Sequence, residues 1–193
     1  MQSYDFSGIT EWNRIRGWFD LNKAIAVQRR VKELANDSTL VELGSFQGRS
    51  SVAIGAVLPD GARLHCVDHF QGSSEHYQMN IDVSDLKQGF MKNIEAFGVS
   101  DRIETVDMTT LEAATHFEDE SVDFILLDAS HDYNSVYADL NAWYPKLRSG
   151  GMLFCDDYDP RWPGVIKAVA EFGIDGDLAA PALWFHRKQN CQP

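Results

Sequence analysis

The feature that most constrains the fold is a regular alternation between short apolar runs and longer segments with helical periodicity. Five apolar runs have the length and composition of buried strands: 39–45, 63–70, 102–108, 122–130 and 151–158. Helix-like stretches follow them, at about 49–58, 84–97, 109–117, 133–147 and 162–172. Because parallel strands are joined by crossover helices, this alternation predicts an α/β fold with a mainly parallel sheet. The tail at 182–188 is typical of a last strand, which we expect to be antiparallel.

The N-terminal part, about residues 10–36, is predicted to be helical, with an apolar face that includes Trp12, Ile15 and Phe19. The chain has 193 residues and neither an internal repeat nor a low-complexity linker. We therefore expect one domain over 1–193, with an N-terminal helical segment at 1–36 and an α/β core at 37–193. The polar segment 71–83 lacks periodicity and follows the second strand, so it is a candidate lid, with an ordinary surface loop as the alternative.

Composition and charge argue against several classes of function. The formal charge is 17 − 29 = −12, with no basic stripe that would displace counterions from nucleic acid. No apolar run approaches the roughly 20 residues of a membrane helix, and the first residues lack the pattern of a signal peptide, so we expect a cytoplasmic protein. Two cysteines, Cys66 and Cys155, lie in apolar runs and are predicted to be small buried hydrophobes, and Cys191 is a tail thiol.

A glycine turn follows the first strand, in the stretch VELGSFQGRSS at 41–51. Gly44 and Gly48 would let the backbone approach a ligand at the strand's carboxyl end, although packing of the turn alone also accounts for them. The next strand ends in Asp68, where an acid can accept hydrogen bonds from a ribose diol, as in sites for NAD or S-adenosylmethionine. Phe46 stands where the dinucleotide pattern requires its second glycine, and Glu42 favours the amino-acid end of S-adenosylmethionine. The third strand ends in Asp107 and Met108, in a position to flank an adenine.

Five motifs together resemble the S-adenosylmethionine-dependent methyltransferases of the Rossmann-like class: VELGSFQGRSS, CVDHFQG, LLDASHDY, LRSGGMLFCDDY and PGVIKAVAEF. More narrowly, they resemble the small-molecule O-methyltransferases that include metal-dependent enzymes acting on antibiotic sugars. The resemblance spans about residues 38–172 and implies a three-layer fold whose seven-stranded, mainly parallel sheet has an antiparallel last strand. It implies cofactor contacts at Glu42, Gly44, Ser45, Gly48, Asp68 and Asp107. Neighbouring positions complete the predicted cofactor-binding set, namely Ser50, His69 and Met108.

In such a fold the strand ending in Asp128 neighbours the strand ending in Asp156 and Asp157. Three carboxylates packed at one sheet edge would repel one another unless a hard divalent cation, of which Mg²⁺ is the expected one, binds them. A substrate hydroxyl on that cation would become more acidic. The alternative interpretation is that these are solvated, turn-forming aspartates. The metal-dependent members of the resembled group carry acids at these positions.

His131 follows Asp128 by three residues, and an imidazole is suited to removing a hydroxyl proton near neutral pH. We therefore predict His131 and Asp128 as catalytic residues of a metal-assisted O-methyltransferase acting on a small molecule, such as a sugar or another natural-product intermediate. Two other functions remain open, a dinucleotide-dependent oxidoreductase and a non-catalytic cofactor-binding subunit. We expect no nucleic-acid or membrane partner, and the aromatic N-terminal segment leaves a homo-oligomer open.

Overall fold

The computed structural model describes residues 9–189, so the tail thiol Cys191 lies outside the described residues. Within them, seven strands form one sheet in the order β3-β2-β1-β4-β5-β7-β6. Neighbours among the first five strands of the chain pair in parallel, and β7 pairs antiparallel with both β5 and β6. The strands are β1 (Thr39–Leu43), β2 (Arg63–Val67), β3 (Ile103–Val106), β4 (Val122–Leu127), β5 (Leu147–Cys155), β6 (Asp177–Ala180) and β7 (Leu183–Arg187). The predicted seven-stranded sheet with an antiparallel last strand is confirmed.

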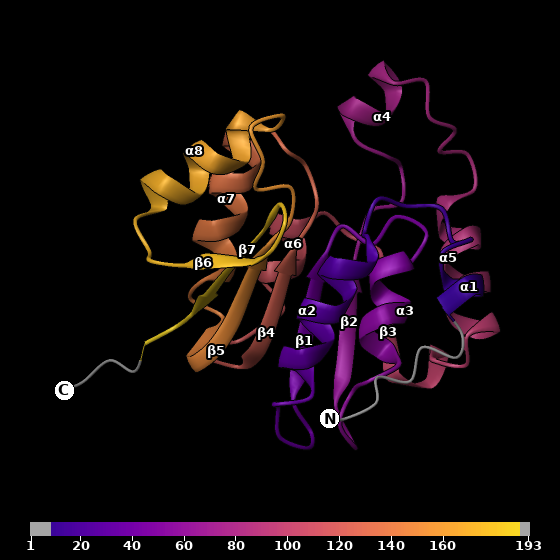
Figure 1. Ribbon diagram of the computed structural model, residues 1–193, viewed down its shortest axis with the longest axis horizontal. Coiled ribbons are helices and arrows are strands. Elements are labelled where there is room, and N and C mark those ends of the chain that lie inside the picture. Colours follow the sequence, from indigo (N-terminus) through magenta and orange to yellow (C-terminus); the bar gives the residue numbers. More distant parts are fainter. Residues whose placement is uncertain (1–8, 190–193) are drawn as a thin grey trace.

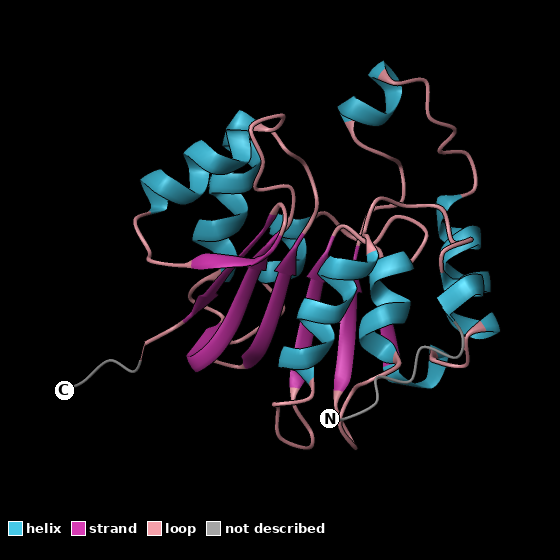
Figure 2. Ribbon diagram, viewed as in Figure 1, coloured by secondary structure: helices cyan, strands magenta, loops and turns pink. Residues whose placement is uncertain are grey.

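Helices cover both faces of the sheet and make the three layers that the sequence predicted (Figures 1 and 2). One face packs against α2 (Leu21–Val31), α3 (Arg49–Gly55) and α5 (Leu86–Ala96). The other face packs against α6 (Thr110–Ala114), α7 (Tyr133–Trp143) and α8 (Pro163–Phe172). Three short helical elements complete the described chain: α1 (Ile9–Trp12), α4 (Ser74–Gln78) and the 3₁₀ turn η1 (Ser100–Arg102).

The central strand β4 shows why the sheet needs two helical layers. All six of its residues are buried, and from Phe124 to Leu127 their side chains alternate between the two faces. Phe124 and Leu126 pack with the α2–α3–α5 layer, whereas Ile125 and Leu127 pack with the α6–α7–α8 layer. A strand covered on both sides is expected to be apolar at successive positions, which accounts for the unbroken run in the sequence.

The N-terminal segment is not the single helix that the sequence predicted over residues 10–36. Helix α1 ends at Trp12 and α2 begins only at Leu21, with turns between them. The break has two causes in the sequence: Gly17 has a φ of +155°, and Asp20 caps α2 by accepting hydrogen bonds from the first backbone amides of that helix. The intervening residues dock on α3, where the Arg49 guanidinium donates to the carbonyl of Gly17 over 2.7 Å.

Two connecting regions also differ in detail from expectation. The polar segment 71–83 contains the short helix α4, which stands well beyond the carboxyl ends of the strands in Figure 1. The tail predicted as a last strand over 182–188 forms β7, and β6, which was not predicted, pairs antiparallel with it. Cys66 and Cys155 are buried as predicted. Among residues 9–189, no helix is both long and apolar enough to cross a bilayer.

Candidate active site

A cavity of about 870 Å³ lies at the carboxyl ends of the strands, a volume typical of small-molecule sites. Its floor consists of residues that directly follow β1, β2, β4 and β5, and its rim comes from the α1–α2 connection, the α4 segment and the turn before α8. The predicted catalytic and metal-binding residues all line it, namely Asp128, His131, Asp156 and Asp157. Open α/β sheets bind ligands at this edge, so the cavity is the candidate active site.

Gly44 brings the first and fourth strands together below the cavity. Its φ is +86°, and a Cβ at this position would collide with the carbonyl oxygen of Asp128. The amide of Asp128 donates to the carbonyl of Leu43, so the hydrogen bonds between β1 and β4 continue up to the glycine turn. The absence of a side chain at residue 44 is therefore required for packing, independently of any ligand.

Asp68 holds the glycine turn to the end of β2. One carboxylate oxygen accepts hydrogen bonds from the amides of Ser45 and Phe46, over 3.0 and 2.9 Å, and the other accepts from Phe70 over 2.6 Å. Phe46 and Phe70 have positive φ values of 48° and 52°, which are uncommon for large side chains. The predicted ribose-binding carboxylate thus already fixes two strained turns around the cavity.

The other predicted cofactor residues divide into two groups. Several of them line the cavity, namely Gly44, Ser45, Ser50, Asp68, His69 and Met108. Three others lie outside its lining: Glu42, Gly48 and Asp107. Glu42 is fully buried beneath the turn and accepts a hydrogen bond from Ser51, and burial raises the pKa of this carboxyl. Asp107 pairs at the surface with Lys87 over 2.8 Å.

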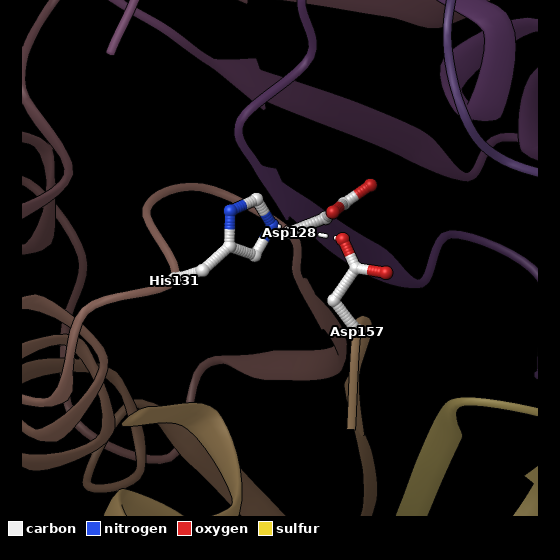
Figure 3. Close-up of side chains that lie close together, drawn as sticks. All are labelled: Asp128, His131 and Asp157. Carbon is white, nitrogen blue, oxygen red and sulfur yellow. Dashed lines mark ion pairs between the residues drawn. The ribbon is translucent and has the colours of Figure 1, made fainter. Parts of the chain in front are cut away.

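The acidic strand ends converge because β4 and β5 are parallel neighbours. The amide of Asp156 donates to the carbonyl of Leu127 over 2.9 Å, so the residues that follow β4 and β5 lie side by side at the same edge of the sheet. Asp157 follows in a left-handed conformation with a φ of +53°, and its carboxylate points toward His131 and Asp128 (Figure 3). One ligand atom each of Asp128, His131 and Asp157 lies within 4.8 Å of the others, a spacing that could hold a metal ion.

His131 sits between two carboxylates. Its Nε2 lies 2.9 Å from an oxygen of Asp157, and Figure 3 shows the ring directed at that carboxylate with Asp128 alongside. Its Nδ1 lies 3.0 Å from Glu75 on α4, which also accepts a hydrogen bond from the backbone amide of His131. Trp162 stacks on the ring at 4.3 Å between centroids. The imidazole is therefore fixed in orientation from three sides.

The charges of the cluster shift one another's pKa values. Burial alone would lower the pKa of His131, but the carboxylates of Asp157 and Glu75 raise it to about 10. Burial, together with repulsion from Asp156 and Asp157, raises the pKa of Asp128 well above its ordinary value. Burial would also raise the pKa of Asp157, but His131 and Lys23 outweigh it and the pKa is lowered. The two neighbouring carboxylates therefore favour the charged form of the imidazole.

Sequence reasoning missed Lys23, whose ammonium lies 2.5 Å from Asp156 and 3.5 Å from Asp157. The spacing of apolar residues in the sequence could have predicted that Lys23 is buried. Lys23 precedes Val27 and Val31 by four and eight residues, which places it on the buried face of α2. A lysine at such a position is almost never buried without a partner, so the spacing indicates an acidic neighbour in the fold.

Two further features of the cavity had no signal in the sequence. Glu75 lies 56 residues before its partner His131, and only the tertiary fold brings them together. At the rim, Trp18, Phe46 and His76 form an aromatic cluster with ring centroids 5.0 to 5.7 Å apart. These rings come from three separate segments, of which α4 supplies His76, and all three line the cavity.

Solved structures similar to this one share its fold at low sequence identity. The O-methyltransferase NovP matches with a TM-score of 0.70 and 16% identity, over 88% of this chain and 81% of that one. An O-methyltransferase from Bacillus cereus in complex with SAH has a TM-score of 0.61 and 17% identity, over 94% and 86%. A SAM-dependent O-methyltransferase from Thermotoga maritima has a TM-score of 0.67 and 11% identity, over 97% and 72%.

Sequence comparison adds one curated relative and a family. The relative is the uncharacterized protein R132 of Acanthamoeba polyphaga mimivirus, 27% identical over 154 residues. The match covers 75% of this chain and spans 66% of the relative's length. The family model described as "Methyltransferase domain" matches residues 41–158, which hold the glycine turn, Asp68 and the acidic cluster. The match extends over more than half of the chain, and the chain therefore belongs to this family of methyltransferase domains.

Proposed function

We propose that this protein transfers a methyl group from S-adenosylmethionine to the hydroxyl of a small molecule, with help from a divalent cation. The observation that carries the proposal is one cavity that joins the glycine turn and Asp68 to the cluster of Asp128, His131 and Asp157. Membership in the methyltransferase family supports the cofactor. The acceptor class, a sugar or another natural-product hydroxyl, follows from the resemblance of the motifs.

The residues present fit the cofactor. Ser45 lines the cavity, and its buried hydroxyl makes no hydrogen bond to a described residue, so a bound ligand could satisfy it. Asp68 would hold the ribose hydroxyls, the turn of Gly44 and Ser45 would hold the methionine end, and Met108 would lie against the adenine. The bound cofactor supplies the electrophilic methyl group. Proximity of that group to the acceptor hydroxyl is expected to provide much of the rate.

The residues also fit a divalent cation, because carboxylate oxygens of Asp128 and Asp157 lie within 4.8 Å of each other, next to the Asp156 carboxylate that accepts the amide of Asp157. Asp128, Asp156 and Asp157 would hold it, and Mg²⁺ is the favoured ion for the carboxylates. When bound, it supplies positive charge that makes an acceptor hydroxyl more acidic and favours the neutral imidazole of His131. His131 would then accept the hydroxyl proton, while Trp162 and Glu75 keep the ring oriented.

Calorimetry with S-adenosylhomocysteine, NAD and MgCl₂, each added separately, tests the proposal. We expect heat of binding with S-adenosylhomocysteine and none with NAD. Methyl transfer from labelled S-adenosylmethionine to a panel of sugar and phenolic hydroxyls should stop after chelation with EDTA and return with Mg²⁺. Binding of NAD in place of S-adenosylhomocysteine would point to an oxidoreductase, and full transfer after exhaustive chelation would remove the cation from the mechanism.

A further inference from the structure

Lys23 is the buried cation of the acidic cluster. Only 5% of the residue is exposed, and its ammonium contacts both residues that follow β5. The first turn of α2 that carries it is fixed, because the amide of Lys23 donates to the capping carboxylate of Asp20 over 3.0 Å. The lysine is therefore built into the site by the start of a helix that lies far from the acids in the sequence.

Packing does not account for a charged side chain at this position. The remaining buried residues of the same helical face include Ala24, Val27 and Val31, and an apolar side chain of similar length would continue that face. Burying an ammonium is unfavourable unless carboxylates balance it. The acids of the cluster are the only partners that Lys23 has among the described ion pairs, so its charge is directed at them.

The same carboxylates belong to the cation site proposed above. One oxygen of Asp156 lies 2.5 Å from the ammonium and also accepts the amide of Asp157, so a metal ion would have to displace the lysine to use it. We propose that Lys23 is a resident counter-cation that competes with the divalent cation for Asp156 and so weakens metal binding by the site. This inference rests on the proposed function, because it concerns the same carboxylates.

Competition of this kind has a definite consequence for affinity. A divalent cation that takes this oxygen of Asp156 must open the contact with Lys23, which is a charge-assisted hydrogen bond in a buried place. Losing one such bond corresponds to about a 10- to 150-fold change in an equilibrium constant. Replacing Lys23 by methionine keeps most of the length and removes the charge, and it should tighten metal binding by about that factor.

The experiment measures Mn²⁺ binding to the full chain at pH 7.5, by calorimetry and by the electron paramagnetic resonance signal of free Mn²⁺. Wild type is compared with Lys23→Met, and Lys146→Met serves as the matched control. Lys146 pairs with Asp119 over 2.7 Å at the opposite end of β5, so its loss removes the same formal charge far from the site. We expect tighter binding by Lys23→Met and an affinity within about twofold of wild type for the control.

The outcomes separate this proposal from the one on which it rests. Equal or weaker Mn²⁺ binding by Lys23→Met than by a wild type that does bind the ion overturns the competition and leaves the metal site intact. Absence of binding by both proteins overturns the cation site itself and the competition with it. Should Lys23→Met fail to fold, Lys23→Gln keeps a hydrogen-bond donor for Asp156 without the charge and must bind Mn²⁺ more tightly than Lys23→Arg, which keeps the charge.

Discussion

Replacing Asp68 by asparagine should destabilise the protein even without any ligand. The carboxylate accepts hydrogen bonds from three backbone amides, of Ser45, Phe46 and Phe70. An asparagine side chain has one acceptor oxygen, so at least one amide loses its partner and faces another N–H donor. The loss of one charge-assisted hydrogen bond and the weakening of the remaining ones cost about 2–4 kcal/mol. The positive φ values of Phe46 and Phe70 favour relaxation of these turns once the anchor is removed.

Equilibrium unfolding in urea, followed by tryptophan fluorescence, measures this change. With a urea dependence of about 1–3 kcal/mol per molar, the loss of about 2–4 kcal/mol should lower the unfolding midpoint by roughly 0.7–4 M. Asp119→Asn is the control, because Asp119 is exposed and its pairing with Lys146 is expected to contribute less than about 1 kcal/mol. An Asp68→Asn protein whose free energy of unfolding matched that of the control would refute the anchoring role. Titration of folded Asp68→Ala with S-adenosylhomocysteine separately checks the ribose contact, whose loss should weaken binding by about 1–3 kcal/mol.

Two other changes have defined outcomes. His131→Ala should lower kcat by about 10²- to 10⁴-fold and leave the affinity for S-adenosylhomocysteine nearly unchanged, and a wild-type kcat would place the base elsewhere. Asp139 on α7 is buried, accepts a hydrogen bond from Thr110, and has a pKa raised to about 6, chiefly by burial. Because the charged form is disfavoured in the folded protein, wild type should lose stability relative to Asp139→Asn as the pH rises from about 4 to 6, by up to about 3 kcal/mol. Urea unfolding at pH 4 and pH 7 measures the difference, and parallel pH profiles would contradict it.

Most of the sheet could be predicted because its strands are covered on both faces. A continuous apolar run such as the one ending at Leu127 is too short for a membrane helix and lacks helical periodicity, so a buried strand is the structure that it favours. Strand β6 escaped prediction because its residues are mostly exposed, as at Leu178, and carry no apolar run. The break between α1 and α2 escaped it for another reason. The apolar spacing continues through Ile15 and Phe19, which are buried although the backbone there is not helical.

The site residues that follow neighbouring strands could be predicted from the sequence. Contacts between segments that are far apart in the sequence could not. Asp128 and Asp157 come together because the parallel pairing of β4 and β5 follows from the order of motifs. Glu75 contacts His131 because of the path that the polar segment 71–83 takes, and that segment has no hydrophobic periodicity from which its path could be predicted. Lys23 is an intermediate case. Its position on the apolar face of α2 predicts a buried lysine, but the sequence does not predict which acidic residue pairs with it.

The floor of the cavity and the α4 segment at its rim contribute differently to the stability of the fold. The floor is continuous with the sheet, where the added Cβ at Gly44 alone would collide with the backbone that follows β4. Helix α4 has no buried residue, and Tyr77 and Met79 at its end are 61% and 54% exposed. Substitutions there spare the hydrophobic core and leave the free energy of unfolding largely unchanged. Under the proposed function, substitutions at Met79, which lines the cavity and is exposed, would change which acceptors fit while the floor that holds Asp128 and Asp157 stays intact.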